Sequence, residues 1–235
     1  MVYITLRTDE VRRLSFYLAM EEYVARHLDA TDCFFMWQVE PSVIFGRNQQ
    51  MESEVNLEFC RQRGIQVYRR KSGGGCVYAD MNNIMLSYIT SDENVGYVFN
   101  KFIGMILLVL SKLGIEAVST THNDVLIDGR KVSGSAFYHL PGGSIVHSTL
   151  LYDTNMENIT TAITPSQEKL ETKGIQSVRQ RITLLKDYVS MNIEELKTFI
   201  RETLCDGERV LSTSEVAAIE KLEQTYLSDD FIHLL

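Results

Sequence analysis

Three consecutive cationic residues, Arg69 to Lys71, run into three consecutive glycines, Gly73 to Gly75, with only Ser72 between them. Neighbouring glycines carry no Cβ atom and tolerate positive φ angles, so a ligand can approach their backbone amides closely. The adjacent cations could neutralise an anionic group such as a phosphate. The segment therefore predicts a phosphate-binding loop, and a glycine-rich turn with solvated basic neighbours is the alternative.

Lys131 is the second candidate, because it stands at the start of a predicted strand beside the small residues Ser133 to Ala136. A lysine there could contact two anionic groups at once, whereas an isolated lysine in a hairpin more often faces solvent. Asn123 and Asp124 offer oxygen ligands suited to Mg²⁺, or else form an Asx turn. His147 lies inside a predicted strand, where a hydrogen-bonded core histidine is commoner than a catalytic base.

Short apolar segments at 65–70 and 77–79 predict strands on both sides of the glycines. A Walker-type loop needs Gly-Lys-Ser/Thr opening a helix and a dinucleotide loop needs G-x-G-x-x-G opening one, and neither is present. We therefore expect a strand-turn-strand cradle, with Lys131 on the return strand of a hairpin turned at Asp128-Gly129. Periodicity predicts further strands at 33–39, 42–45, 84–90, 115–118 and 144–152, and helices at 10–29, 55–63, 96–113, 156–163, 177–190, 193–205 and 214–227.

Composition limits the classes of protein that the chain can represent. Its 235 residues suit one domain or two small subdomains with a shared core. The net charge of −8 argues against a general binder of nucleic acid or membrane surfaces. The four cysteines are widely spaced, which argues against a zinc site and a disulfide framework. With no apolar signal segment and no apolar run longer than Met105 to Leu110, we expect a reduced, cytoplasmic protein.

Together these segments resemble the catalytic domain of lipoate-protein ligases, in the wider family of biotin ligases and lipoyl or octanoyl transferases. The resemblance spans about residues 10–225, and ordered motifs are more specific than any one of them. Four family motifs occur in order: GR-x-Q at Gly46 to Gln49, RR-x-SGGG-x-V-Y at Arg69 to Tyr78, N-D-L-x-x-x-G-x-K-V-S-G-S-A at Asn123 to Ala136 with H-x-T-L-L at His147 to Leu151, and KGI-x-SVR at Lys173 to Arg179.

The resemblance implies an α+β fold, with a mixed, mainly antiparallel sheet packed by helices, as one domain over residues 1–235 whose part after about residue 155 is helical. It implies formation of lipoyl-adenylate from ATP and lipoate, then transfer of the lipoyl group to a carrier lysine. The carriers would be lipoyl domains of 2-oxoacid dehydrogenase complexes or the glycine cleavage H protein. Many such ligases have a C-terminal accessory domain, which we do not expect here, so a separate accessory subunit is left open.

The resemblance also assigns residues to roles. Lys131 would be catalytic, bridging the lipoate carboxylate and the α-phosphate, and Asn123 and Asp124 would hold Mg²⁺. Lipoate would contact Lys131, Ser135, Ala136 and His147. ATP would contact Arg70, Ser72, Gly73, Gly74, Gly75, Cys76, Val77, Tyr78 and Lys131.

Some positions depart from the family pattern. Tyr138 stands where well-known members have an arginine, and Cys76 stands where they often have alanine. One alternative function is an octanoyl or lipoyl transferase that works through a cysteine thioester, although the loop Ser119 to His122 has no cysteine and Cys76 more often would be a small buried filler. The other alternative is a non-catalytic module that binds lipoate, biotin or a nucleotide.

Overall fold

A large central sheet organises the molecule, and the computed structural model describes residues 1–27, 31–121, 123–163 and 181–233. The strand order is β11-β1-β2-β6-β10-β9-β8-β7. β1 pairs in parallel with β2 and β11, and the other neighbours are antiparallel, so the sheet is mixed and mainly antiparallel as predicted. Its strands are β1 (Val2–Thr5), β2 (Cys33–Trp37), β6 (Asn83–Thr90), β7 (Val118–Ser119), β8 (Asp124–Ile127), β9 (Arg130–Leu140), β10 (Gly143–Leu151) and β11 (Gly207–Val210).

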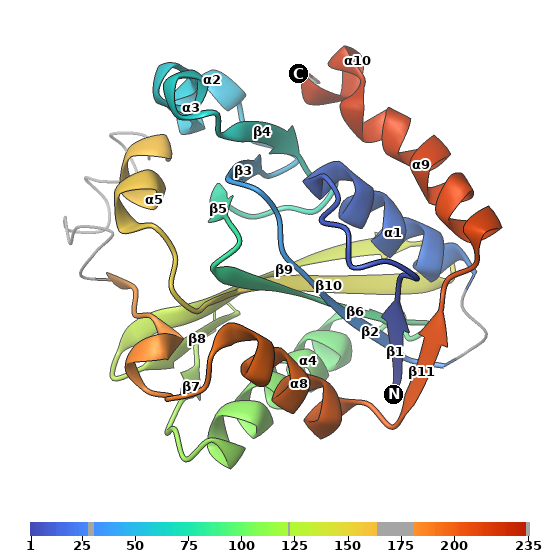
Figure 1. Cartoon of the computed structure of the whole chain (residues 1–235). Coiled ribbons are helices and arrows are strands. Elements are labelled where there is room, and N and C mark those ends of the chain that lie inside the picture. The colour runs from blue at the N-terminus through green and yellow to red at the C-terminus, as the bar shows by residue number, and fades with distance from the viewer. Residues whose placement is uncertain (28–30, 122, 164–180, 234–235) are drawn as a thin grey trace.

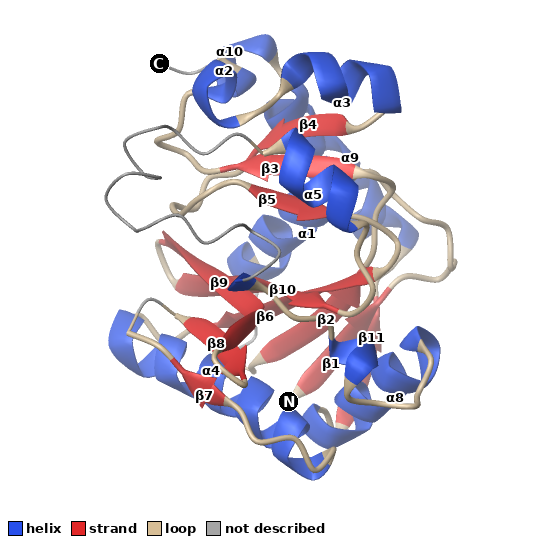
Figure 2. Cartoon of the chain, turned by 90° about the vertical axis from the view of Figure 1, so that its left-hand side faces the viewer, coloured by secondary structure: helices blue, strands red, loops and turns tan. Residues whose placement is uncertain are grey.

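A second, three-stranded sheet carries the glycine segment, and Figure 2 shows it stacked above the large sheet. Its central strand is β3 (Ser42–Phe45), which pairs in parallel with β4 (Gln66–Arg69) and antiparallel with β5 (Val77–Ala79). The strands on either side of the glycines are therefore β4 and β5, as predicted, but they are not neighbours, because β3 lies between them. The connection at residues 70–76 must cross the end of β3.

Helices cover both faces of the large sheet (Figure 1). One face packs against α1 (Leu14–Arg26), which lies beside α9 (Thr213–Leu227), and the other packs against α4 (Val95–Lys112) and α8 (Ile193–Leu204). With helices on both faces, every residue of β10 is buried. The shorter helices are α2 (Met51–Glu54), α3 (Leu57–Arg63), α5 (Met156–Ala162), the 3-10 helix η1 (Leu185–Asp187) and α10 (Asp229–Ile232).

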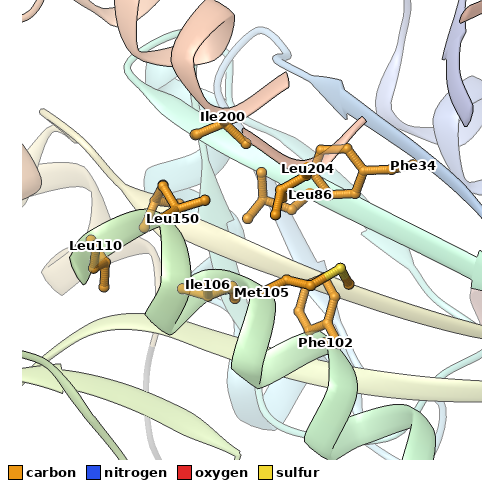
Figure 3. A pocket seen from close by; sticks show the side chains of 10 residues that line it. Phe34, Leu86, Phe102, Met105, Ile106, Leu110, Leu150, Ile200 and Leu204 are labelled. Atoms are coloured by element: carbon orange, nitrogen blue, oxygen red, sulfur yellow. The ribbon is translucent and has the colours of Figure 1, made fainter. Parts of the chain in front are cut away.

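α4 is the apolar helix that the sequence predicts over residues 96–113. By length and mean hydropathy, 1.5, it is the helix within the described ranges that could cross a membrane. Phe102 and Ile106 pack it against the sheet, as in the core helix of a globular domain, while Tyr97 and Leu108 are exposed. Between α4, α8 and the sheet, apolar side chains surround a gap of about 10 Å³, which has room for at most one water molecule (Figure 3).

Two predicted elements differ from the structure, and two strands of the large sheet were not predicted. The strand expected at 115–118 is reduced to Val118–Ser119, and β1 and β11 are not predicted. The helix expected at 177–190 lies partly outside the described residues, and its described part holds only η1 beyond Arg181, so this prediction is wrong there. The reason is visible at Thr183, whose N–H donates to the carbonyl of Lys131 at 2.9 Å, so this backbone pairs with β9 instead of with itself.

Candidate active site

The carbonyl groups of the glycine loop point inward, towards the side chain of Arg70. The buried guanidinium donates to the carbonyl oxygens of Gly73 (2.7 Å) and Gly75 (2.6 Å). These peptides are trans, so their N–H groups, which belong to Gly74 and Cys76, point the opposite way. Neither N–H donates to any other described residue. Two backbone donors therefore face out of the loop, as an anion site requires.

A third carbonyl, that of Ile44 on β3, also accepts from Arg70 at 3.0 Å. Burial lowers the pKa of Arg70 to about 10, so the side chain is still charged at neutral pH. Removing a charge of this kind from water is tolerated because its donors are used by carbonyl groups. The structure thus shows Arg70 shaping the loop. The sequence-based assignment of Arg70 as a direct nucleotide contact stays a prediction.

Gly46 explains how the loop crosses the end of β3. β3 ends at Phe45, and the N–H of Arg47 donates to the carbonyl of Ser72 at 2.9 Å. A Cβ atom on Gly46 would overlap the carbonyl oxygen of Gly74, well inside the 3.0 Å limit of real Cβ contacts. The GR-x-Q segment and the glycine loop are therefore packed directly against each other. Gly74 itself has a φ of 91°, which favours glycine.

The other two cations of the motif are also bonded inside the protein. Arg69 donates to the carbonyls of Arg47 (2.6 Å) and Ile232 (2.9 Å). Lys71 forms an ion pair with the buried Glu22 at 2.6 Å. The expectation that these three side chains lie free to neutralise a ligand is therefore not what the structure shows. They fix the position of the loop.

Lys131 reaches the site through a β-bulge. β8 and β9 change register between Val125 and Leu126, so that Lys131 pairs with Leu126 while Ser133 pairs with Val125. The extra residue reverses the alternation of side chains along β9. As a result Lys131 lies over Gly134, where any Cβ atom would overlap Nζ. The hairpin turn predicted at Asp128-Gly129 is present, with φ angles of 49° and 74°.

Asp124 holds the end of Lys131 in an ion pair of 2.8 Å. Asn123, next to it, has a φ of 61°, and its carbonyl accepts from the N–H of Ser135 at 3.2 Å. Within the described part of the chain no cluster of three or more His, Cys, Asp or Glu side chains could hold a metal. One carboxylate and one amide suit Mg²⁺ only where phosphate oxygens complete its shell. The residues present fit that arrangement.

Ala136 is where the loop and the sheet meet. A Cβ atom built on Gly74 would lie 3.9 Å from the Cβ of Ala136. Ala136 is opposite His147 in the β9 and β10 pairing, so the two side chains share a face. Ser135 pairs with Ser148 and faces the other side, towards α4. The structure thus brings Ala136 and His147 together beside the loop, but not the side chain of Ser135.

A buried chain of hydrogen bonds joins the loop to α1. Ser72 Oγ lies 2.8 Å from His147 Nε2, and His147 Nδ1 lies 2.9 Å from Glu21 Oε2. Ser87 donates to the other oxygen of Glu21, and Trp37 Nε1 donates to Ser87 at 2.8 Å. The chain fixes both nitrogens of His147, which agrees with the sequence expectation of a hydrogen-bonded core histidine. It also fixes the start of the glycine loop through Ser72.

Sequence reasoning missed Glu21 and its neighbour Glu22, which are only 3% and 1% exposed. The signal was present, because Leu18, the glutamate pair and Ala25 recur at helical spacing on one face of α1. Burial raises the pKa of Glu22, whereas the hydrogen bonds from Lys71 and Arg26 lower it. The hydrogen bonds have the larger combined effect, so the pKa of Glu22 lies below the usual value.

The remaining predicted nucleotide contacts follow the loop. Cys76 is partly buried, and burial raises the pKa of its thiol to about 12. Val77 and Tyr78 begin β5, and the Tyr78 side chain points into the small sheet's own core, where Asn158 donates to its hydroxyl at 2.8 Å. The Tyr78 side chain is therefore not available to a ligand, whereas the half-buried Val77 side chain lies on the opposite face of β5. The KGI-x-SVR segment, Lys173 to Arg179, lies outside the described residues.

Residues 14–205 match the family model described as the lipoyl protein ligase A/B catalytic domain. The chain belongs to this family. It is 35% identical over 208 residues to the lipoate-protein ligase LplJ of Bacillus subtilis, covering 87% of the chain and 63% of that relative. Lipoate-protein ligase 1 of Staphylococcus aureus is also 35% identical, with coverage of 87% and 65%. The chain thus spans somewhat less than two thirds of the length of these two curated relatives.

Solved structures of lipoate-protein ligases share the fold. A chain described as part of a bi-partite lipoate protein ligase, studied with its E2 lipoyl domain from Thermoplasma acidophilum, has a TM-score of 0.85 and 25% identity, covering 99% of this chain and 95% of that one. A lipoate-protein ligase A bound with ATP has a TM-score of 0.84 and 23% identity, with coverage of 100% and 99%. The predicted fold class of this lipoyl ligase family member is therefore confirmed.

Proposed function

We propose that this protein catalyses ATP-dependent ligation of lipoate through a lipoyl-adenylate. The observation that carries the proposal is the meeting of two features at Ala136. The outward N–H groups of Gly74 and Cys76 form one side, and Lys131, held by Asp124, forms the other. A phosphate and a carboxylate could lie between them.

The chemistry of adenylation explains why both sides are needed. A carboxylate must approach the negatively charged α-phosphate of ATP, so the barrier is largely electrostatic and positional. Lys131 can neutralise both groups at once, and the loop amides can hold the phosphate oxygens. A carboxylate oxygen then bonds to the α-phosphorus while the bond to pyrophosphate breaks. In the second step the carrier amine bonds to the acyl carbon, AMP leaves, and the amine loses a proton.

Mg²⁺ is part of the proposal, since Asp124 and Asn123 offer a carboxylate and an amide beside the proposed phosphate position. The metal would neutralise charge on the phosphate chain. We also propose a lipoyl domain as the carrier, with the H protein as a second candidate. The related ligase from Thermoplasma acidophilum, described together with its E2 lipoyl domain, supports the first carrier. A separate accessory subunit remains part of the proposal, because the curated relatives are longer.

A cysteine-dependent acyl transferase is the alternative within the same fold. Cys76 carries a thiol beside the glycine loop. Burial raises the pKa of this thiol to about 12, so the reactive thiolate would be scarce at neutral pH. Thr120 and Thr121 occupy the loop in which related transferases would need their cysteine. Both observations favour the ligase.

A mass measurement separates ligase, transferase and binding module. The protein is incubated with lipoate, ATP, Mg²⁺ and an unmodified lipoyl domain, and the domain is weighed. We expect a gain of one lipoyl group that requires ATP and is lost in Lys131→Ala, with the fold of the variant checked by circular dichroism. A gain from an acyl-carrier donor without ATP would indicate the transferase. No gain, even with a candidate accessory subunit added, would leave only the binding module.

A further inference from the structure

The hydrogen-bond chain at the start of the glycine loop joins a hydroxyl, an imidazole and a carboxylate in that order. Ser72 Oγ lies 2.8 Å from His147 Nε2, and His147 Nδ1 lies 2.9 Å from Glu21 Oε2. In serine hydrolases the same order of groups activates the hydroxyl as a nucleophile, and the arrangement recurs on unrelated folds. The order of these three groups therefore fits a nucleophilic Ser72.

The hydrogen bonds around Glu21 fix the direction of the chain. One oxygen of its carboxylate accepts from Ser87, whose hydroxyl accepts from Trp37 Nε1. A carboxylate oxygen only accepts, so His147 Nδ1 must donate to the other oxygen, Oε2. Nε2 then carries the free electron pair, and the hydroxyl of Ser72 donates to it. This is the tautomer in which a histidine can take the proton of a serine.

The glycine loop also carries donors that acyl transfer requires beside a nucleophile. The N–H groups of Gly74 and Cys76 follow Ser72 by two and four residues and are directed away from Arg70. Attack on an ester or a thioester puts negative charge on the acyl oxygen, and backbone N–H groups stabilise such an oxyanion. One short loop thus holds the hydroxyl and the donors together.

An acyl group would reach Ser72 along the face of the sheet that carries His147. Ser72 is 2% exposed, and the three glycines that follow it are exposed, so its hydroxyl lies just beneath the surface of the loop. Ala136 shares this face with His147, and it is where we place lipoate. The acyl carbon of a bound acid derivative would therefore lie near the nitrogen that Ser72 contacts. This acyl position rests on the proposed function.

Two other potential nucleophiles near the loop are less suited to the reaction. Burial raises the pKa of the Cys76 thiol to about 12, so its thiolate is scarce at neutral pH. Lys131 forms an ion pair with Asp124 at 2.8 Å, and a charged ammonium has no electron pair with which to attack. Ser72, by contrast, is already hydrogen-bonded to a base.

We propose that Ser72 is a nucleophile that cleaves activated esters and thioesters of acids the size of lipoate, without ATP. Its oxygen bonds to the acyl carbon and its proton passes to His147 Nε2. The bond from the acyl carbon to the alcohol or thiol breaks, and that leaving group takes the proton from His147. Water then attacks the seryl ester, His147 carries the proton back to Ser72, and the carboxylic acid leaves. Esterase activity is thus added to the proposed ligation.

A coloured ester tests the proposal directly. The full protein is incubated with p-nitrophenyl octanoate without ATP, release of nitrophenolate is followed, and the protein is weighed and digested. We expect continuous release and one octanoyl group on the peptide that holds Ser72. Ser72→Ala should lose the octanoyl group and slow release by about a hundredfold or more. Glu21→Gln should slow release by a similar factor, because the tautomer of His147 is no longer fixed.

Ser148→Ala is the matched control, since Ser148 is a buried serine next to His147 whose side chain lies on the opposite face of β10. It should keep the wild-type rate of release. Ser72→Cys should take up the octanoyl group again, which a damaged loop would not do.

Three outcomes would overturn the proposal: no release above the rate in buffer, wild-type release in Ser72→Ala, or an octanoyl group on Lys131 or Cys76 instead. ATP-dependent lipoylation of a lipoyl domain, measured on the same preparation, tests the proposed function separately. If lipoylation occurs and the ester is not cleaved, only the role of Ser72 as a nucleophile is refuted. If the ester is cleaved and lipoylation fails, the proposed ligation is refuted instead.

Discussion

Because Gly46 has no side chain, the glycine loop can pack directly against the end of β3. The Cα of Gly46 packs under the carbonyl of Gly74, and a methyl group there would overlap backbone, which cannot rotate away. We predict that Gly46→Ala lowers the free energy of unfolding by about 1 to 3 kcal/mol and weakens ATP binding, because the loop must shift. Denaturant unfolding and titration with ATP would measure the two effects.

Gly73→Ala is the control for that variant. A Cβ atom on Gly73 would meet nothing within 4 Å, and its φ is not in the positive region. We expect a change in stability within about 0.5 kcal/mol. Equal losses in Gly46→Ala and Gly73→Ala would mean that added bulk, and not the contact with Gly74, is responsible.

Gly134→Ala should separate activity from stability. Its Cβ atom would overlap the flexible end of Lys131 and lie 3.2 Å from a carboxylate oxygen of Asp124. The lysine can swing aside at little cost, so we expect a nearly unchanged unfolding midpoint together with a loss of adenylation of at least tenfold, as a misplaced catalytic group produces. Gly104→Ala, on the exposed face of α4, should keep adenylation and raise the unfolding midpoint, because alanine favours the helix. Wild-type adenylation in Gly134→Ala would show that Lys131 need not lie over Gly134.

Residue type and spacing were enough to single out Lys131 and the glycine loop, which the structure places along the same face of β9, over Gly134 and against Ala136, while their roles stay predictions. They were not enough for Arg70. Its charge suggests a ligand contact, and only the three-dimensional structure reveals that its donors are taken by carbonyl groups of the loop. The same holds for Glu21, whose partner His147 is 126 residues away in the chain.

At the scale of elements, α1 connects the loop to the C-terminal helices through Glu22. The carboxylate accepts from Lys71 and from the hydroxyl of Tyr226 on α9, at 2.9 Å for the latter. Because the pKa of Glu22 is lowered by these bonds despite its burial, its contribution is complete above the ordinary glutamate pKa of about 4.3. It is lost as the pH falls through the lower folded-state value.

Lys71→Met should therefore destabilise the protein in a pH-dependent way. We expect its unfolding midpoint to lie below that of the wild type above about pH 5, with the difference shrinking as Glu22 takes up a proton below about pH 4. Chemical denaturation at a series of pH values measures this. Arg61→Met, which breaks an exposed ion pair with Glu58 on α3, should change little. A constant difference from pH 3 to 7 would contradict the assigned role of the pair.

The elements themselves were largely predictable, since most of the predicted helices and strands lie within a few residues of their positions. Their arrangement was less so. The local sequence does not show that β3 lies between β4 and β5. β3 is more than twenty residues away from each of its two partners in the sequence, and it pairs in parallel with β4 and antiparallel with β5. The bulge at Val125 and Leu126 is likewise a property of two paired strands, not of one.

At the scale of the whole molecule, the edge of the large sheet is built from two strands that are about 200 residues apart in the sequence. β1 lies between β2 and β11, and Val2 pairs with Gly207. Strands of four residues give weak local signals, so their identity depends on pairing that sequence periodicity does not show. The N-terminal ammonium also pairs with Asp206 at 2.5 Å.

Ile4→Ala should consequently destabilise the protein as much as the loss of a side chain from the core, although Ile4 belongs to the short strand β1. Ile4 is 1% exposed within the cluster under α1, so we expect a loss of about 2 to 5 kcal/mol in the free energy of unfolding. Val210→Ala, on the exposed side of β11, should cost less than 1 kcal/mol. Similar losses for both variants in denaturant titrations would mean that β1 is not part of the core.

The contact between Arg69 and the carbonyl of Ile232 has a consequence for the newly made chain. The two residues are 163 positions apart, which corresponds to roughly 10 to 30 s of synthesis at common ribosome speeds. Until α10 has left the ribosome, the residue beside Arg70 lacks one of its two acceptors, and β1 lacks β11. The candidate site therefore reaches its final form only after α10 has been made, long after the glycine loop itself.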